Sequence, residues 1–196
     1  MSPREIAILV MAGGASRRFG ADDKLLADID GQSLGLKAAT ALALCGWAQK
    51  LAVANVSLAN GFEFLGYKVV EAKAGNGLGD NMALGAGALD DVAGVLIILT
   101  DMPFVTEAHI HALLETATSP ASIVCTEVGR NLMPPVLIGR DYFGQLKTLS
   151  GDQGAKGLFA LAGPNLDRVA APANTMADVD TTEDFERARN RLTLRS

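Results

Sequence analysis

Glycines and basic residues stand close together near the start of the chain, in the stretch LVMAGGASRRFGADDKLL at 9–26. Gly13 and Gly14 let the backbone approach an anion closely, and Arg17, Arg18 and Lys24 bring positive charge to the same place. The stretch has neither the Gly-x-x-x-x-Gly-Lys-Ser/Thr spacing of a P-loop nor the Gly-x-Gly-x-x-Gly spacing of a dinucleotide-binding loop. It therefore indicates a different local site for a multivalent anion, with a surface loop of solvated basic residues as the alternative.

Two carboxylates also lack an obvious structural role. Asp101 lies just past the most apolar expected strand, and Thr106 is better placed to cap the helix that follows. Asp180 lies ahead of the last expected helix, where Thr181 or Thr182 can be the N-cap. Two hard oxygen ligands from separate strand ends suit Mg²⁺, which binds few protein ligands and also binds substrate phosphates.

The elements that must position these residues alternate along the chain. Strands are expected at residues 5–12, 50–56, 67–72, 94–99 and 122–127. Helices are expected at about 33–46, 79–89, 107–118, 141–149, 154–161 and 182–192. This alternation predicts an α/β fold, a three-layer α/β/α Rossmann-like architecture with a mostly parallel sheet. Such sheets bind ligands at the carboxyl ends of their strands, which is where the Gly/Arg stretch and Asp101 fall.

The composition is that of a globular protein, since 49% of the 196 residues are hydrophobic and 20% are charged. We expect a single domain over residues 1–196. The formal net charge of −5 provides no overall basic field for a nucleic acid. No apolar run approaches the roughly 18 residues of a membrane span. These features predict a soluble, cytoplasmic protein with neither a nucleic-acid nor a membrane partner.

The two cysteines and two histidines, residue types that often act in catalysis or metal binding, are not expected to do so here. Cys45 and Cys125 lie in apolar surroundings without metal-ligand spacing, so we expect reduced thiols in the core. His109 and His111 are two residues apart on an expected helix and therefore face different directions. We expect both histidines to be solvated, and we identify no Cys–His or Ser–His nucleophile.

Four motifs, in order along nearly the whole chain, resemble one enzyme family. LVMAGGASRRFGADDKLL resembles the signature loop of the nucleotidyltransferases that attach a nucleotide to the molybdenum cofactor (molybdopterin), of cytidylyl or guanylyl type. These belong to the glycosyltransferase-A-like NTP-transferase superfamily. LTDMPFV (99–105) resembles the family's metal-binding strand end, LSGDQGAKGL (149–158) its later glycine loop, and DVDTTEDF (178–185) its second metal aspartate. The resemblance implies the nucleotide-diphospho-sugar transferase type of fold.

The resemblance also implies roles for particular residues. Arg18, Lys24 and Asp101 are implied to be catalytic. If adjacent side chains diverge and only one points inward, Arg17 should matter less than Arg18. The implied cofactor is Mg²⁺, which we expect Asp101 and Asp180 to hold. The residues implied for nucleotide binding are Ala12, Gly13, Gly14, Arg18, Lys24, Asp80, Asn81 and Asp101.

Two segments depart from the family pattern. In the family, the segment that reads GNGLGDNMALGAG here (75–87) contacts the base or ribose, commonly through a serine, whereas Asp80 or Asn81 stands nearby in this chain. Relatives of the cytidylyl type usually have an Arg-Gly-x-Pro run before the strand that reads PPVLIGR here. This chain has GRNLMPP, so Arg130 lacks its glycine neighbour and is displaced from the proline. The second departure leaves the acceptor open.

The implied reaction is nucleotidyl transfer, in which a phosphate on the pterin attacks the α-phosphorus of a nucleoside triphosphate and pyrophosphate leaves. The implied partners are these two small-molecule substrates, together with a protein that delivers the cofactor or the chaperone of an acceptor molybdoenzyme. Three alternatives stay open: a GTP-dependent guanylyltransferase, a sugar- or lipid-precursor nucleotidyltransferase, and a non-catalytic nucleotide-binding protein of the same fold. The presence of Lys24, Asp101 and Asp180 favours catalysis.

The motifs disagree about the base. MAGG (11–14) and FGADDK (19–24) look like the guanylyl pattern, whereas LTDMPFV, LSGDQGAKGL and Asp180 look cytidylyl-like. We interpret Gly13 as widening the space for a base, which admits a purine without excluding cytosine. The later motifs cover more of the chain and include a metal ligand, so we expect CTP to be preferred over GTP.

Overall fold

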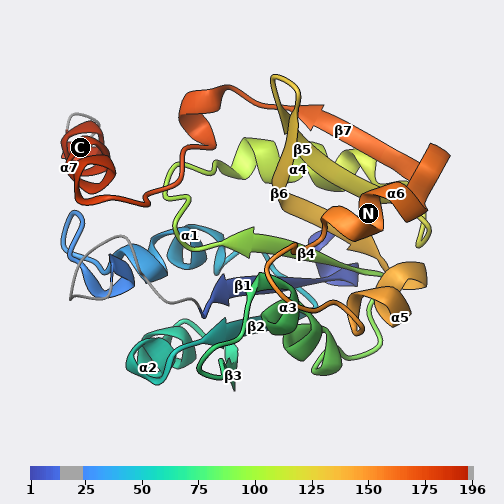
Figure 1. Cartoon of the computed structure of the whole chain (residues 1–196), viewed down its shortest axis with the longest axis horizontal. Helices are drawn as coiled ribbons and strands as arrows, with labels where there is room; N and C mark the ends of the chain where they lie inside the picture. Colours follow the sequence, from blue (N-terminus) through green and yellow to red (C-terminus); the bar gives the residue numbers. More distant parts are fainter. Residues whose placement is uncertain (14–23, 194–196) are drawn as a thin grey trace.

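Seven strands form one sheet, and helices cover both of its faces in the computed structural model of the chain (Figure 1). The structure describes residues 1–13 and 24–193. The predictions for Gly14, Arg17 and Arg18 lie outside this part of the chain. The predicted three-layer α/β/α fold with a mostly parallel sheet is confirmed.

The sheet has a mixed order with one reversed strand. Its strands are β1 (Ile6–Ala12), β2 (Gln49–Ala54), β3 (Lys68–Glu71), β4 (Gly94–Leu99), β5 (Ile123–Val128), β6 (Asn131–Gly139) and β7 (Leu166–Ala170). They lie in the order β3-β2-β1-β4-β6-β5-β7, and only the pairs that contain β6 are antiparallel. The chain passes from β1 to β2 and β3 on one side and then crosses to β4 on the other. The carboxyl ends of β1 and β4 therefore lie where the strand order reverses, the usual ligand crevice of such folds.

The helices form two layers and one separate element. One face is covered by α1 (Leu34–Leu42), α2 (Val56–Phe64) and α4 (Glu107–Thr116), and the other by α3 (Leu78–Gly87), α5 (Phe143–Leu146) and α6 (Lys156–Ala162). Figure 1 shows α7 (Thr182–Thr193) beyond the carboxyl ends of β1 and β4. No helix in the described residues is both long and apolar enough to cross a membrane.

The central strand β1 shows how the sequence builds the two layers. All seven residues of β1 are buried. Because side chains alternate across a strand, Ile8 and Val10 pack with the layer of α1, α2 and α4, whereas Leu9 and Met11 pack with the layer of α3, α5 and α6. A strand covered on both faces needs apolar residues at every position, which explains its continuous apolar run.

The helix α7 packs on the segment that follows the Gly/Arg stretch. Its apolar residues pack with residues that follow the Gly/Arg stretch and with a phenylalanine that follows β4, in a small third cluster. The buried members of this cluster are Ile29, Leu34, Phe104, Val179, Phe185 and Ala188. The cluster thereby holds three distant parts of the chain together at the same end of the sheet.

The segment after β2 differs from the expectation. The strand expected at 50–56 ends at Ala54, because Asn55 precedes the helix α2, which the pattern does not predict. Gly61 lies inside α2 and weakens its helical signal. A Cβ atom at Gly61 would lie 2.5 Å from Leu36 Cδ1, so this glycine lets α2 pack closely on α1.

The sequence identifies only part of β6 and misses β7. β6 contains Pro134 and Pro135, and proline cannot donate to a strand ladder, so the run does not resemble a central strand. The structure accommodates the prolines by a register shift between Cys125 and Thr126 on β5. The edge strand β7 is mostly exposed and lacks a clear apolar alternation.

The expectation that both histidines are solvated is wrong for His109. His109 is partly buried, and its Nε2 lies 2.8 Å from Thr126 Oγ1. The hydroxyl of Thr126 donates its proton to the carbonyl of Pro135, so Nε2 of His109 must be the donor in the other contact. Burial lowers the pKa of His109, whereas His111 is exposed on the same helix. Of the cysteines, Cys125 is buried as expected and Cys45 is partly exposed.

Candidate active site

A pocket of about 670 Å³ opens at the carboxyl ends of β1, β2, β3 and β4. Its size is in the range of small-molecule sites. Its described lining residues are Met11, Ala12, Gly13, Lys24, Leu25, Asn55, Ala72, Lys73, Ala74, Gly75, Asn76, Gly77, Leu78, Asn81, Leu99, Thr100, Asp101, Asp152 and Asp180.

The ammonium of Lys24 lies between two carboxylates in this pocket. Its Nζ donates to Asp101 Oδ2 at 2.9 Å, to Asp180 Oδ1 at 3.0 Å and to the carbonyl of Val179 at 2.8 Å. The Lys24 side chain is only 12% exposed. Burial alone would lower the pKa of Lys24, but the charges and hydrogen bonds of Asp101 and Asp180 outweigh it and raise the pKa above its usual value. The amine is therefore held as a cation.

Backbone hydrogen bonds bring the two aspartates together from distant segments. Thr100 donates through both its N–H and its hydroxyl to the carbonyl of Met11, which ties the end of β4 to the end of β1. The next residue, Asp101, accepts the N–H of Val179 on its carbonyl oxygen at 2.8 Å. This bond fixes the segment before α7 beside the end of β4, so the carboxylate of Asp180 comes within 3.0 Å of the Lys24 ammonium.

The start of α7 is stabilised by a reciprocal cap. The N–H of Asp184 donates to Thr181 Oγ1 at 3.1 Å, and the N–H of Thr181 donates to Asp184 Oδ2 at 2.9 Å. Of the two expected candidates, Thr181 rather than Thr182 therefore has the capping role. Thr106 caps α4 as expected, because its hydroxyl accepts the N–H of His109. Asp180 has no part in this cap through its side chain and is left to face the pocket.

The donor set fits a hard divalent cation. Asp101 Oδ1 is buried and has no hydrogen-bond partner among the described residues, so one carboxylate oxygen remains available for a ligand. Burial raises the pKa of the nearby Asp178, and the charges of Asp180 and Asp101 add to this, while the charge of Lys24 acts in the other direction. No group of three or more carboxylate, imidazole or thiol ligands converges within residues 1–13 and 24–193. Mg²⁺ and Mn²⁺ suit a site in which two protein carboxylates bind the metal and a substrate supplies the other ligands.

The start of α3 holds the end of β1 in place. Asn81 is buried, and its Nδ2 donates to the carbonyl of Gly13 at 2.7 Å, while its Oδ1 accepts from Asn76 Nδ2 at 3.1 Å. Asp80 does not line the pocket, because its carboxylate accepts the N–H of Gly77 at 2.9 Å and caps the helix. Asn81 thus positions the backbone of the Gly/Arg stretch at Gly13.

Gly13 has a packing role that the sequence analysis did not identify. A Cβ atom at Gly13 would lie 2.3 Å from Ala72 Cβ and 3.2 Å from Asn81 Nδ2. The methyl group of Ala72, at the end of β3, therefore fills the space that Gly13 leaves. The interpretation that Gly13 widens the space for a base is wrong, because a neighbouring side chain already occupies that space.

The later glycine loop packs on the start of α3. The N–H of Gly79 donates to the carbonyl of Gly151 at 2.7 Å. A Cβ atom at Gly77 would lie 2.5 Å from both Gly151 and Asp152, so only glycine allows this close approach. As a result Asp152 reaches the pocket from a part of the chain far from the other lining residues.

The structure brings together most of the residues singled out from the sequence. Those that line the pocket are Ala12, Gly13, Lys24, Asn81, Asp101 and Asp180, whereas Gly14 and Arg18 lie outside the described residues. The sequence analysis missed Asn55, Lys73 and Asp152. Asn55 and Lys73 closely follow β2 and β3, so the strand-end argument applied to Asp101 could have found them.

Comparison with known proteins identifies the family. A profile of the MobA-like NTP transferase domain matches residues 8–169, and the chain belongs to this family. The purine catabolism protein PucB of Bacillus subtilis (strain 168) is 25% identical over 209 residues, which cover 97% of this chain and 98% of PucB.

Solved structures have a similar fold. The structure of a homologue of Mycobacterium tuberculosis Rv0371c, from Mycobacterium sp. strain JC1, has a TM-score of 0.79 and 25% identity, with all of both chains covered. Rv0371c of Mycobacterium tuberculosis H37Rv in complex with manganese has a TM-score of 0.74 and 22% identity, covering 95% of this chain and 98% of that one. At this lower identity the likeness shows the nucleotidyltransferase fold alone.

Proposed function

We propose that the chain catalyses Mg²⁺-dependent transfer of a nucleoside monophosphate from a nucleoside triphosphate, CTP in preference to GTP, to the phosphate of the molybdenum cofactor pterin. The observation that carries this proposal is the position of Lys24 Nζ, 2.9 Å from Asp101 Oδ2 and 3.0 Å from Asp180 Oδ1 at the ends of the central strands. A cation held between two carboxylates in an open pocket is suited to phosphate chemistry.

The reaction exchanges one phosphoanhydride bond for another. An oxygen of the acceptor phosphate forms a bond to the α-phosphorus, and the bond from that phosphorus to the α–β bridging oxygen breaks. Pyrophosphate leaves with the electron pair of the broken bond. Because both reactants are anions, the site must offset their repulsion and hold them in line.

The residues of the pocket divide this work. Among the described lining residues the basic ones are Lys24 and Lys73, and their ammonium groups attract and orient the triphosphate. Arg18 is assigned to the same phosphates. Asp101 and Asp180 would hold Mg²⁺, which when bound neutralises phosphate charge and polarises the phosphorus–oxygen bonds. The manganese complex of Rv0371c supports a divalent metal in this fold.

The preference for CTP rests on sequence motifs. LTDMPFV, LSGDQGAKGL and the aspartate at position 180 favour the cytidylyl type. Gly13 is not evidence for a purine base, since Ala72 fills the space beside it. The pterin acceptor rests on membership of the MobA-like family and on the four motifs in family order.

Two measurements test this proposal. Purified protein with Mg²⁺ and the molybdenum cofactor pterin is assayed for pyrophosphate release with each of the four ribonucleoside triphosphates, and we expect the highest kcat/KM with CTP. Asp101→Asn, which keeps the side-chain shape, should show no release above background. Isothermal titration should show that CTP binds more tightly than GTP. If GTP instead binds at least tenfold more tightly, a difference of about 1.4 kcal/mol in binding free energy, the preference for CTP is wrong and the reaction type is unaffected.

A further inference from the structure

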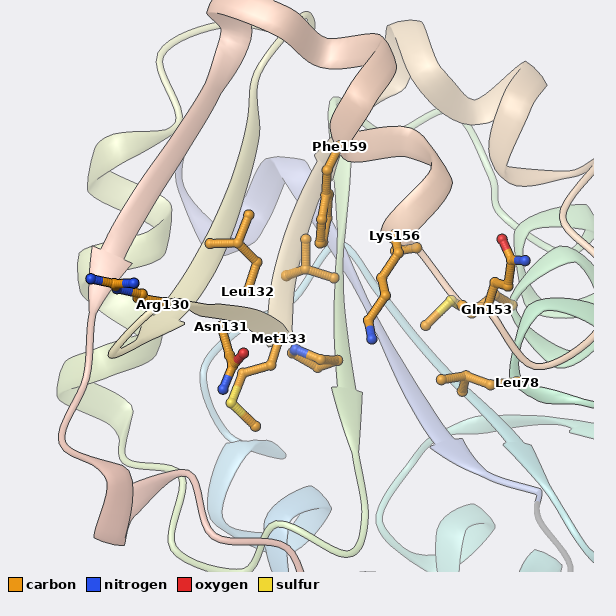
Figure 2. A pocket seen from close by; sticks show the side chains of 13 residues that line it. Leu78, Arg130, Asn131, Leu132, Met133, Gln153, Lys156 and Phe159 are labelled. Carbon is orange, nitrogen blue, oxygen red and sulfur yellow. The ribbon is translucent and has the colours of Figure 1, made fainter.

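A second pocket of about 550 Å³ adjoins the first on the side of β6. Figure 2 shows the side chains that line this second pocket. Leu78, the first residue of α3, lines both pockets. The later glycine loop also spans the boundary, because Asp152 lines the first pocket and Gln153 lines the second. A molecule in the second pocket therefore lies next to a molecule in the first.

The walls of this second pocket are largely apolar and come from three elements. β6 supplies one wall, and α3 and α6 supply the other. The apolar lining residues are Leu78, Met82, Leu132, Met133, Pro134, Val136, Ala155 and Phe159. Figure 2 shows the Phe159 ring pointing into the space between β6 and α6. Aromatic and methionine side chains contact flat rings well, and methionine adapts to irregular shapes.

The polar side chains of the second pocket are available for a ligand. Asn131, Gln153 and Lys156 line it, and none of their side chains has a hydrogen bond or ion pair to another described residue. In Figure 2 the ammonium of Lys156 points into the gap between Leu78 and the β6 residues. None of the described lining residues is acidic, although the chain as a whole has a net charge of −5.

Arg130 contributes less to this pocket than its position in the sequence suggests. Figure 2 shows its guanidinium directed away from the space, at the outer end of the β5–β6 hairpin. Lys156 is therefore the cation at the boundary with the first pocket. A single ammonium between apolar walls matches a ligand that has one anionic group and a flat, mostly apolar body.

We propose that this second pocket binds the acceptor of the nucleotidyl transfer, a phosphorylated small molecule with a flat heterocyclic ring. The ring lies between Met133 and Phe159, and Lys156 contacts the phosphate. Asn131 and Gln153 meet the hydrogen-bonding edge of the ring. The phosphate is then on the Leu78 side, facing the triphosphate in the first pocket. This assignment rests on the proposed function for the identity of the ligand as an acceptor.

The six methionines of the chain allow each pocket to be observed separately. Met82 and Met133 line the second pocket, and Met11 lines the first. With the methionine methyl groups labelled with ¹³C, neopterin monophosphate should shift the resonances of Met82 and Met133 and leave Met11 unchanged. CTP with Mg²⁺ should shift Met11. Neopterin without its phosphate, and inorganic phosphate alone, should each bind at least tenfold more weakly than the phosphorylated pterin.

Variants test the role of Lys156. Lys156→Gln should weaken neopterin monophosphate binding at least tenfold and raise the KM for the acceptor by a similar factor, with the KM for CTP changed less than twofold. Arg130→Gln should weaken that binding less than threefold. Lys147→Gln is the matched control, since Lys147 is an exposed lysine that lines neither pocket. Because Lys156 is also exposed, the melting temperature of Lys156→Gln should equal that of the wild type.

The outcomes separate this inference from the proposed function. Neopterin monophosphate that shifts Met11 alone, or that binds equally well to Lys156→Gln, would overturn the acceptor pocket even if pyrophosphate release with CTP is normal. Shifts at Met82 and Met133 that depend on Lys156 support the pocket. If such shifts occur while no triphosphate yields pyrophosphate, the proposed reaction is wrong and the proposed binding site is still supported.

Discussion

Lys24 and Asp101 are 77 residues apart in the chain, and their side chains meet at 2.9 Å between Nζ and Oδ2. The contact joins a residue near the end of the Gly/Arg stretch to a residue that lies two positions beyond the end of β4. Asp180 completes the arrangement from the start of α7, at 3.0 Å from the same ammonium. One lysine thus links the three segments that carry the proposed phosphate and metal ligands, and substitutions there should affect both catalysis and metal binding.

Replacement of Lys24 by methionine should have two measurable effects. Loss of the ammonium should lower kcat/KM by about 2–4 kcal/mol of transition-state stabilisation, roughly 30- to 900-fold. The carboxylates of Asp101 and Asp180 then face each other without the ammonium between them. Addition of about 5 mM Mg²⁺ or Mn²⁺ should therefore raise the melting temperature of Lys24→Met more than that of the wild type. Lys37→Met, which removes an exposed pair with Asp30, is the control. An equal metal effect in all three proteins would show that Lys24 does not share its position with the metal.

Asp101→Asn should abolish turnover with little change in stability. The amide keeps the shape of the side chain, and Lys24 retains its bonds to Asp180 and to the carbonyl of Val179. We expect the melting temperature to stay within a few degrees of the wild type while stabilisation by Mg²⁺ is lost. Asp90→Asn, at an exposed position away from the pocket, should behave like the wild type in both assays. Normal pyrophosphate release by folded Asp101→Asn would disprove the assignment of Asp101.

Gly13→Ala should destabilise the fold through a direct clash. The new methyl group would lie 2.3 Å from Ala72 Cβ, and overpacking of this kind costs about 1–3 kcal/mol in the free energy of unfolding. Ala72→Gly in the same chain should recover at least half of the loss, because it removes the opposing methyl group. Gly87→Ala is a suitable comparison, since no atom lies within 4 Å of a Cβ atom there. Urea unfolding gives the free energy of unfolding of the wild type, the two single variants and the double variant. If the double variant recovers no stability, the clash with Ala72 is not the cause of the destabilisation.

The stability of the protein should depend on the protonation of His109. Burial lowers the pKa of His109 in the folded state below its value of about 6.5 in the unfolded chain. The unfolded state therefore binds the proton first as pH falls, and stability is lost from about pH 6.5 down to the folded pKa. In His109→Gln the slope of unfolding free energy against pH between 7 and 5 should be smaller, by at most about 1.4 kcal/mol per pH unit. His111→Gln, exposed on the same helix, should keep the wild-type slope; a reduced slope in that variant instead would contradict the assignment to His109.

The sequence predicts much of the site because its residues follow strand ends. Asp101 is found in this way, since β4 is an uninterrupted apolar run whose bounds are the ones expected. The same logic extends to Lys73, which follows the strand expected at 67–72 and lies two residues beyond the end of β3. Asp180 is identified by elimination, because Thr181 and Asp184 account for the cap of α7.

Other features depend on contacts that no local pattern encodes. The role of Gly13 follows from Ala72, which is on another strand, and the burial of His109 follows from Thr126 on β5. The second pocket is formed by β6 and α6, and β6 is only partly recognisable because of Pro134 and Pro135. Local propensity describes the elements, and tertiary packing decides which of their side chains meet.

The packing of α7 bears on where this protein can be shortened. The family profile ends at residue 169, before Val179, Asp180 and α7. A chain cut there would lose one of the two carboxylates around Lys24 and the carbonyl that accepts its third hydrogen bond. It would also expose Ile29, Leu34 and Phe104 to water, a new apolar surface that favours aggregation. The folded domain is therefore longer than the segment that the family profile matches, and expression of the shortened form should give insoluble protein.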